Sequence, residues 1–236
     1  MTLELRRVAV EVTGRRLLDN VHLAVPAGEC VAIMGPSGVG KTSLLNCIAG
    51  IAAPASGSIL VDGVEVSAMS TQGRAAFRLR RIGLVFQFGE LLPELTVAEN
   101  VALPSRLMGM TREAAADRAM PLLARFGLAD RAGSHPQELS GGQQQLVGIA
   151  RALAHEPVLV LADEPTGMLD EANTARVADV LIRASRELGA ATVVVTHDRN
   201  VACRADRVLA IVDGSLTVTG GSSVTEPDEP VAEPSL

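Results

Sequence analysis

The 236-residue sequence contains no tryptophan, no tyrosine and only four phenylalanines. Aromatic faces are a common means of holding a flat ligand ring, so this chain offers few positions for such stacking. Cysteine is also scarce, because Cys30, Cys47 and Cys203 are the only three, and they lie far apart without metal-ligand spacing. We therefore expect three buried thiols in a reducing compartment.

The chain also lacks an excess of basic residues and any long apolar run. Its net charge is -6 and its pI is about 5.3, whereas nucleic-acid binders usually carry a basic footprint, so no nucleic acid is expected as a partner. No segment approaches the roughly 18 apolar residues of a membrane-spanning helix, and the first residues alternate in polarity, unlike a signal peptide. We expect a cytoplasmic protein that acts at a membrane only through a partner.

Short apolar runs that alternate with amphipathic segments predict an α/β fold with a mixed central sheet. Two segments, 41–49 and 171–188, have the spacing of amphipathic helices. The runs typical of buried parallel strands are Cys30–Met34, Ile82–Phe86, Val158–Ala162 and Thr192–Thr196.

Alternating polarity at the N-terminus predicts a second, antiparallel β subdomain. Residues 3–12 and 17–25 read as its strands. Asp62-Gly63 is a strong turn signal and predicts a hairpin between 58–61 and 64–67.

The middle of the chain changes character and predicts an inserted α-helical subdomain over residues 88–140. Residues 96–126 within it are rich in alanine, leucine, methionine and arginine, which favour helices. We expect residues 1–218 to form one domain, closed by a hairpin over 206–218. Residues 219–236 are rich in glycine, serine, proline and glutamate, which predicts a disordered acidic tail.

A glycine-rich loop between the first apolar run and the first helix matches the pattern G-x-x-x-x-G-K-[ST]. Its glycines let main-chain N–H groups turn toward a phosphate chain, and the following helix points its positive end at the anion. The lysine places a charge near the β- and γ-phosphates, and the threonine hydroxyl can ligate Mg²⁺. A surface glycine-rich turn is the plainer alternative, but the strand–loop–helix context favours a P-loop NTPase that binds ATP. The residues are Gly35, Pro36, Ser37, Gly38, Val39, Gly40, Lys41 and Thr42.

The buried run 158–162 ends in two adjacent carboxylates, Asp163 and Glu164. The carboxyl end of a parallel strand faces the crevice where ligands bind. Asp163 can hold Mg²⁺ directly or through water, and Glu164 can polarise the water that attacks the γ-phosphate. An acidic helix start or a solvated turn is the alternative for this pair taken alone.

The segment Leu139–Gln143 reads LSGGQ, which is the signature of ATP-binding cassette ATPases. The order of motifs also fits, because the phosphate loop is followed by Gln87, the signature, the acidic strand end and Thr196-His197-Asp198. The chain resembles this family over residues 3 to about 218. A helix that begins with serine and two glycines can bind an anion at its N-terminus. A second such helix N-terminus in one chain is explained if it faces the phosphate held by another subunit.

The resemblance implies roles for the remaining candidate residues. Two cassettes of the family meet head to tail, so a second ATP-binding subunit is expected, as a homodimer, with ATP and Mg²⁺ between the copies. Gln87 would contact Mg²⁺ and the attacking water, and His197 would contact the γ-phosphate. Leu169-Asp170 would reach across the dimer. Taken alone, Gln87 could be an exposed polar residue and His197 a helix cap. The signature residues expected on the neighbour's ATP are Ser140, Gly141, Gly142 and Gln143.

Within the family, residues 85–101 and 162–167 look like those of lipoprotein-releasing, macrolide-export and cell-division ATPases. Members of that group dock on integral membrane proteins. The resemblance therefore implies a permease that docks near Gln87–Asn100 and holds the chain on the inner face of the membrane. The expected function is to power export of an amphiphile, peptide or antibiotic. The alternatives are ATP-driven activation of a membrane partner without transport, or a soluble cassette acting on DNA or ribosomes, which the acidic charge and the single cassette disfavour.

Three positions depart from the family pattern. Val12 stands where an aromatic residue usually stacks on adenine, so it covers the base without π-stacking and GTP is expected to compete with ATP. Leu146 replaces a usual arginine after the signature, and Met168 replaces a frequent asparagine in the loop expected to face the second copy. These changes bear on the rate of the reaction and leave its type unchanged.

Overall fold

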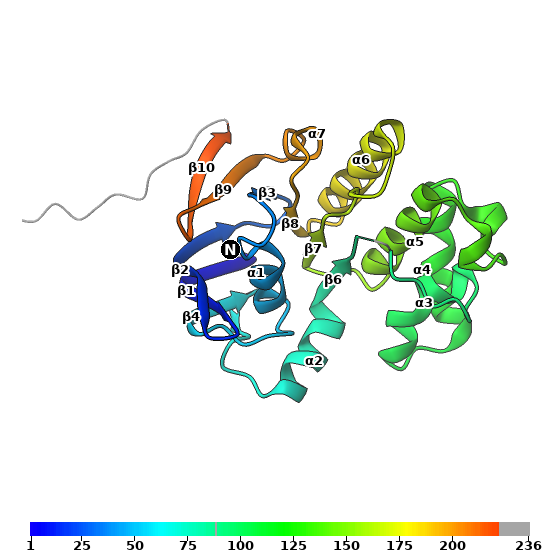
Figure 1. Cartoon of the computed structure of the whole chain (residues 1–236). Coiled ribbons are helices and arrows are strands. Elements are labelled where there is room, and N and C mark those ends of the chain that lie inside the picture. The colour runs from blue at the N-terminus through cyan, green and yellow to red at the C-terminus, as the bar shows by residue number, and fades with distance from the viewer. Residues whose placement is uncertain (88, 222–236) are drawn as a thin grey trace, which may run out of the picture.

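A computed structural model describes residues 1–87 and 89–221 and shows two sheets with helices between and beside them (Figure 1). The larger sheet has the strand order β10-β9-β3-β8-β7-β6, in which only β10 is antiparallel to its neighbour. This confirms the predicted mixed central sheet. Its strands are β3 (Cys30–Met34), β6 (Ile82–Val85), β7 (Leu159–Asp163), β8 (Ala191–Val195), β9 (Arg207–Val212) and β10 (Ser215–Gly221).

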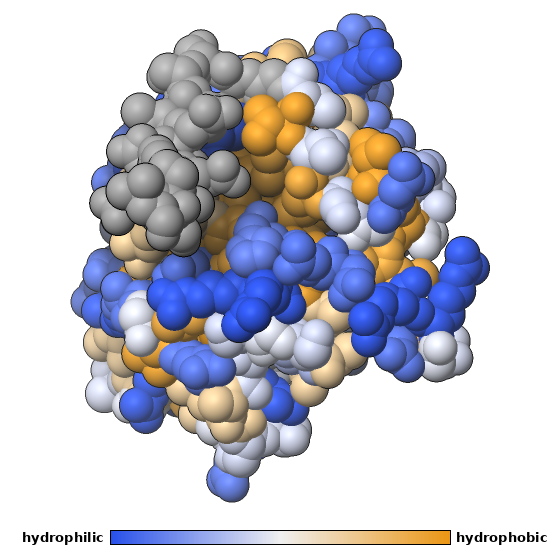
Figure 2. All heavy atoms as spheres, turned by 90° about the vertical axis from the view of Figure 1, so that its left-hand side faces the viewer, coloured by the Kyte–Doolittle hydropathy of each residue, from blue (hydrophilic) through white to orange (hydrophobic). Residues whose placement is uncertain are grey.

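The smaller sheet is antiparallel and has the order β2-β1-β4-β5. A turn at Asp62-Gly63, both at positive φ, joins its last two strands, as the turn signal predicts. A groove between this sheet and the β9–β10 hairpin is lined by Leu5, Leu23 and Leu216, and the apolar hollow on this side is visible in Figure 2. The strands are β1 (Leu3–Val12), β2 (Arg15–Val25), β4 (Ser56–Val61) and β5 (Val64–Glu65).

Helix α1 (Lys41–Ile48) packs between the two sheets, against β1, β7 and β8. Its buried face carries Leu44, Leu45 and Ile48, as the sequence predicts. The helix ends before Gly50, whose φ of 65° suits glycine far better than other residues. These contacts fix the start of α1 relative to the end of β3.

A separate group of helices lies beside the sheets (Figure 1) and consists of α3 (Val97–Leu107), α4 (Arg112–Arg125) and α5 (Gly141–Leu153). Thr96 caps α3 through a capping box with Glu99, so the predicted change to helix at 96 is correct. Because α5 packs on both α3 and α4, this group continues past residue 140, where we expect the helical subdomain to end.

The sequence reading omits α2 (Thr71–Arg81), which carries no fully buried side chain, although Phe77 packs against the core from a partly buried position. At the C-terminal end, β10 pairs with β9 through Gly220 and Gly221, so the strand passes the expected boundary at 219 because its backbone continues the ladder. Residues 222–236, the rest of the expected acidic tail, lie outside the described residues. The remaining helices are α6 (Glu171–Glu187) and α7 (Arg199–Ala202).

One expectation about cysteines is wrong. Cys30 and Cys47 are buried, but Cys203 is exposed because it lies at the C-terminal end of the short surface helix α7. Burial raises the pKa of Cys30 to about 12, so that thiol stays protonated. Among residues 1–87 and 89–221, no helix combines the length and hydropathy that crossing a membrane requires.

Candidate active site

The glycine-rich loop, residues 35–40, connects β3 to α1 and curls around the side chain of Lys41. The Lys41 Nζ donates to the carbonyl oxygens of Gly35 at 2.7 Å and Pro36 at 3.1 Å. Gly38 and Gly40 have φ values of 79° and 109°, which only glycine adopts readily. A phosphate entering the loop would therefore meet N–H groups at the start of α1 and an ammonium group already held at its centre.

The hydroxyl of Thr42 lies next to the carboxylate at the end of β7. Thr42 Oγ1 donates to Asp163 Oδ1 at 3.2 Å. Burial raises the pKa of Asp163, an effect that the Thr42 hydrogen bond opposes and the nearby charge of Glu164 reinforces. A Mg²⁺ ion fits this pair, because it prefers hydroxyl, carboxylate and water oxygens and would offset the burial of the carboxylate.

Glu164 and His197 follow the neighbouring strands β7 and β8 and contact each other. Glu164 Oε2 accepts hydrogen bonds from the His197 main-chain N at 3.3 Å and from Nδ1 at 2.9 Å. Glu164 has a φ of 44°, unusual for a residue other than glycine, and its main-chain N donates to Val195 O at 2.9 Å. The Glu164 side chain is 17% exposed and that of His197 is 66% exposed. The imidazole therefore shields one side of a carboxylate that is otherwise held in a fixed direction.

Gln87 lies two residues beyond the end of β6, beside β7. Its side chain lies against Gly167, where an added Cβ would come within 2.9 Å of Gln87 Nε2. The structure thus brings Gln87, Asp163, Glu164, His197 and the phosphate loop to the carboxyl edge of one sheet. The residue that caps α7 is Asp198. The alternative role of His197 as a helix cap is therefore wrong, because its neighbour has that role.

The signature residues belong to a different packing unit. Ser140 caps α5 through a capping box with Gln143, whose N–H donates to Ser140 Oγ at 3.4 Å. Gly141 and Gly142 are the first two residues of α5, so their N–H groups have no carbonyl one turn earlier within the helix. Helix α5 packs on α3, α4, α6 and β6, whereas α1 packs on β1, β7 and β8. The phosphate loop and the signature are therefore two separate helix starts, each suited to an anion.

The signature helix is fitted closely against the start of α6. A Cβ on Gly142 would come within 2.9 Å of Asn173 Oδ1, and one on Gly141 within 3.6 Å of Leu169. Asn173 is itself held by Asp170, which accepts from its main-chain N and from its Nδ2, both at 2.8 Å. The segment that follows Glu164 thus packs against the signature within one chain.

The three positions that depart from the family pattern have different surroundings. Val12 is 42% exposed at the end of β1, and Met168 is 65% exposed in the loop before α6. Leu146 is buried in the helical group, where it makes apolar contacts in place of the polar contact expected of an arginine.

Two residues of α5 that sequence reasoning missed hold the segment after β6. Gln145 Nε2 donates to Phe86 O at 2.8 Å, and Arg151 donates to Gly89 O at 2.6 Å and Glu90 O at 2.8 Å. They therefore tether the backbone on either side of Gln87 to the signature helix. Arg151 is a charged residue among apolar neighbours, which is its only signal in the sequence, and Gln145 follows two other glutamines and gives none.

Comparison with known proteins agrees with these motifs. A model of the ABC transporter family matches residues 18–167. The chain belongs to the ABC transporter family. It is an ATP-binding ATPase subunit of that family and works with ATP and Mg²⁺.

Several relatives and solved structures are similar to this ABC subunit over most of its length. An uncharacterized ABC transporter ATP-binding protein of Mycobacterium tuberculosis is 45% identical over 204 residues, which cover 86% of this chain and 82% of the relative. The lipoprotein-releasing system ATP-binding protein LolD of Porphyromonas gingivalis is 40% identical over 216 residues, covering 92% and 99%. The ATP-binding cassette MJ0796, solved as a dimer in a post-hydrolysis state with ADP and Pi, has a TM-score of 0.81 at 38% identity, covering 91% and 96%.

Proposed function

We propose that the chain hydrolyses ATP in a composite site between two copies and thereby powers a membrane exporter. The observation that carries this proposal is that two helix N-termini, at Lys41 of α1 and at Ser140 before α5, are each suited to bind an anion. The two helices pack on different elements of the fold. A single chain needs only one of them for its own ATP. A second copy placed head to tail would supply its Ser140 helix start to the phosphate held by Lys41 of the first.

The residues at the sheet edge have distinct tasks in this mechanism. Main-chain N–H groups of the loop and Lys41 bind the phosphates, and Mg²⁺ supplies positive charge to the phosphate oxygens when it is bound at Thr42, Asp163 and Gln87. Glu164 accepts a proton from the attacking water, and its fixed direction keeps the carboxylate in place. His197 orients Glu164 and contacts the γ-phosphate.

Mixing two inactive variants tests the composite site. Lys41→Ala removes the loop charge, and Ser140→Arg blocks the signature. Neither variant alone should hydrolyse ATP. In mixed dimers the loop of the Ser140→Arg chain meets the intact signature of the Lys41→Ala chain, so about a quarter of the wild-type sites return under random pairing in a two-fold dimer. A mixture that releases no phosphate and traps no nucleotide would contradict the shared site.

The chain would reach the membrane through a permease that docks near Gln87–Asn100. A groove of about 450 Å³ opens beside this segment, between α2, β6, α3 and α5. Its walls are mainly apolar, as expected for a surface that receives a helix. Its apolar lining residues are Ala75, Leu79, Ile82, Leu84, Phe86, Leu103, Pro104, Leu107 and Ala152. This location would make the subunit peripheral on the cytoplasmic face of the membrane.

Export of an amphiphile, peptide or antibiotic is the transport function that we propose, supported by the similarity to relatives named for lipoprotein release. The second candidate is ATP-driven activation of the membrane partner without transport. Reconstitution of the chain with its co-purified permease in vesicles separates them. Export requires both ATPase stimulation and net movement of cargo, whereas stimulation without movement supports the second candidate.

A further inference from the structure

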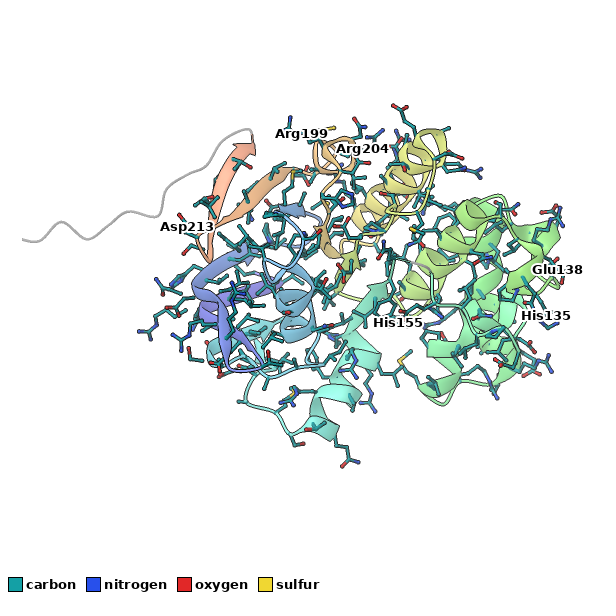
Figure 3. All side chains as sticks on the ribbon, viewed as in Figure 1. His135, Glu138, His155, Arg199, Arg204 and Asp213 are labelled. Atoms are coloured by element: carbon teal, nitrogen blue, oxygen red, sulfur yellow. The ribbon has the colours of Figure 1, made fainter. Side chains whose placement is uncertain are left out.

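The groove beside Gln87–Asn100 carries an excess of positive charge among its mainly apolar walls. Arg78 and Arg151 line it together with His155, and Glu90 is the one acidic residue among its lining residues. His155 lies near the junction of β6 with the helical group (Figure 3). Burial lowers the pKa of His155 below 6.5, so it is neutral at pH 7 and the charge comes from the two arginines.

Neither arginine forms an ion pair with a carboxylate of the described part of the chain, although the charge of Glu90 acts on Arg151 and opposes the lowering of its pKa by burial. Arg151 donates to the carbonyl oxygens of Gly89 and Glu90, and Arg78 donates to those of Ala49 and Gly50, both at 3.3 Å. No ion pair involves either guanidinium within residues 1–87 and 89–219. Main-chain carbonyl oxygens accept hydrogen bonds from the guanidinium groups, but they carry no formal charge and so leave the positive charge of each arginine uncompensated.

An occupant of the groove would remove water from these guanidinium groups. Arg151 is already partly desolvated, and burial lowers its pKa, although arginine stays charged. Covering a cation without a counter-charge is strongly unfavourable, whereas a carboxylate can pair with a guanidinium through two parallel hydrogen bonds. A purely apolar occupant would therefore bind poorly, and a basic one would be repelled.

We infer that the permease segment entering this groove is apolar and carries an aspartate or glutamate that pairs with Arg151, beside the second positive charge of Arg78. This inference rests on the proposed function, since it names the chemistry of the permease at its docking site. Arg151 also holds Gly89 and Glu90, two and three residues after Gln87. The ion pair would therefore form on the segment that leads directly to the active site.

The test uses the full chain and the integral membrane protein that co-purifies with it. Each cytoplasmic aspartate and glutamate of that permease is changed to its amide, alone and together with Arg151→Gln, and the affinity of each complex is measured in detergent. Arg151→Gln should weaken the complex about tenfold or more. Changing one permease carboxylate to its amide should lower the affinity by a similar factor in the wild-type complex. The same change should lower it little further when the chain already carries Arg151→Gln.

Two further variants separate charge from the tethering of the loop. Arg151→Lys keeps the charge but cannot hold both carbonyls as arginine does, so it should retain more affinity than Arg151→Gln. Arg80→Gln is the matched control, because Arg80 is exposed on α2 and does not line the groove; its complex should bind as the wild type does. If circular dichroism shows that Arg151→Gln does not fold, the permease variants are measured with the wild-type chain alone. A permease carboxylate whose removal weakens that complex about tenfold then supports the ion pair with Arg151.

Three outcomes have distinct meanings. Equal weakening by Arg151→Gln and Arg151→Lys, without coupling to any permease carboxylate, overturns the inference and leaves the proposed function standing. If the affinity of the complex depends on anionic lipid and on no permease carboxylate, the inference is also overturned. If no integral membrane protein co-purifies with the chain, the proposed function itself fails.

Discussion

Glu164 and His197 are joined by a hydrogen bond, with the imidazole Nδ1 2.9 Å from the carboxylate Oε2. The acceptor is a carboxylate, so Nδ1 carries the proton and the other ring nitrogen is left to face a ligand. A second hydrogen bond from the His197 main chain reaches the same oxygen. Two donors on one oxygen leave the other oxygen of Glu164 available for water.

Replacing Glu164 with glutamine should stop turnover without preventing ATP binding. The amide keeps an oxygen for His197 but cannot accept a proton, so the hydrolysis rate should fall by a factor of about 10²–10⁴. Because ATP persists, dimers should accumulate and can be measured by light scattering in the presence of ATP. Glu187→Gln, which alters only a surface pair with Arg125, is the control. Hydrolysis at the normal rate by Glu164→Gln would remove Glu164 from the role of base.

How much of this site is readable from the sequence depends on how local its contacts are. The phosphate loop is predictable because strand, loop and helix are contiguous, and their order fixes where Lys41 points. Asp163 and Glu164 are predictable because a buried parallel strand must end at the ligand edge. The contact between Glu164 and His197 spans 33 positions, but both residues follow neighbouring parallel strands, so their proximity follows from sheet topology.

The features that the sequence does not reveal depend on contacts between distant segments. Gln145 and Arg151 act on carbonyls 59 to 62 positions away, and no local pattern records that pairing. Helix α2 buries no side chain fully, and its apolar residues, Ala75, Ala76, Phe77 and Leu79, form too short a run to distinguish a helix from a strand, although Ser70 does cap it. The strand β10 extends over 219–221 because β9 offers backbone partners, which composition cannot show.

Gly142 should be required for the fit between the signature helix and α6. An alanine Cβ would lie 2.9 Å from Asn173 Oδ1 and displace the side chain that Asp170 holds. We expect Gly142→Ala to lower the free energy of unfolding by roughly 1 kcal/mol, the typical net value of the side-chain hydrogen bond from Asn173 to Asp170, and to reduce ATPase activity. Chemical denaturation and phosphate release measure the two effects.

A second substitution identifies the cause of that loss. Asn173→Ala removes the clashing atom, so Gly142→Ala with Asn173→Ala should be less destabilised than the sum of the two single changes. Gly133→Ala is the control, because nothing lies within 4 Å of a Cβ at that position. Additive losses in the double variant would show that the contact with Asn173 is not the reason glycine is needed.

His155 should make the stability of the protein depend on pH. Burial lowers the pKa of His155 in the folded chain below 6.5. The unfolded chain therefore binds a proton at this histidine more readily than the folded chain does. The free energy of unfolding therefore rises with pH in the window below 6.5 and loses this contribution as the pH falls. Compared with His155→Gln, the wild type should lose more stability between about pH 7 and about pH 5.5.

Urea denaturation at several pH values measures this difference. Glutamine can still donate to Ile82 O, which His155 Nε2 approaches at 3.3 Å, but it cannot titrate. His22→Gln at an exposed position is the control and should leave the pH profile unchanged. Parallel profiles for the wild type and His155→Gln would mean that burial of His155 does not disfavour its charged form.

Val12 should limit how tightly the nucleotide base is held. It is 42% exposed at the end of β1 and can cover a ring only by dispersion, so wild-type protein should bind GTP nearly as well as ATP. Val12→Phe would add ring stacking of about 0.5–1.5 kcal/mol, which corresponds to a roughly 2- to 10-fold gain in ATP affinity measured by calorimetry. Val64→Phe is a matched control, because Val64 is 43% exposed on the distant β4–β5 hairpin and should change nothing. A strong preference of the wild type for ATP, or an unchanged affinity in Val12→Phe, would show that the base lies elsewhere than against Val12.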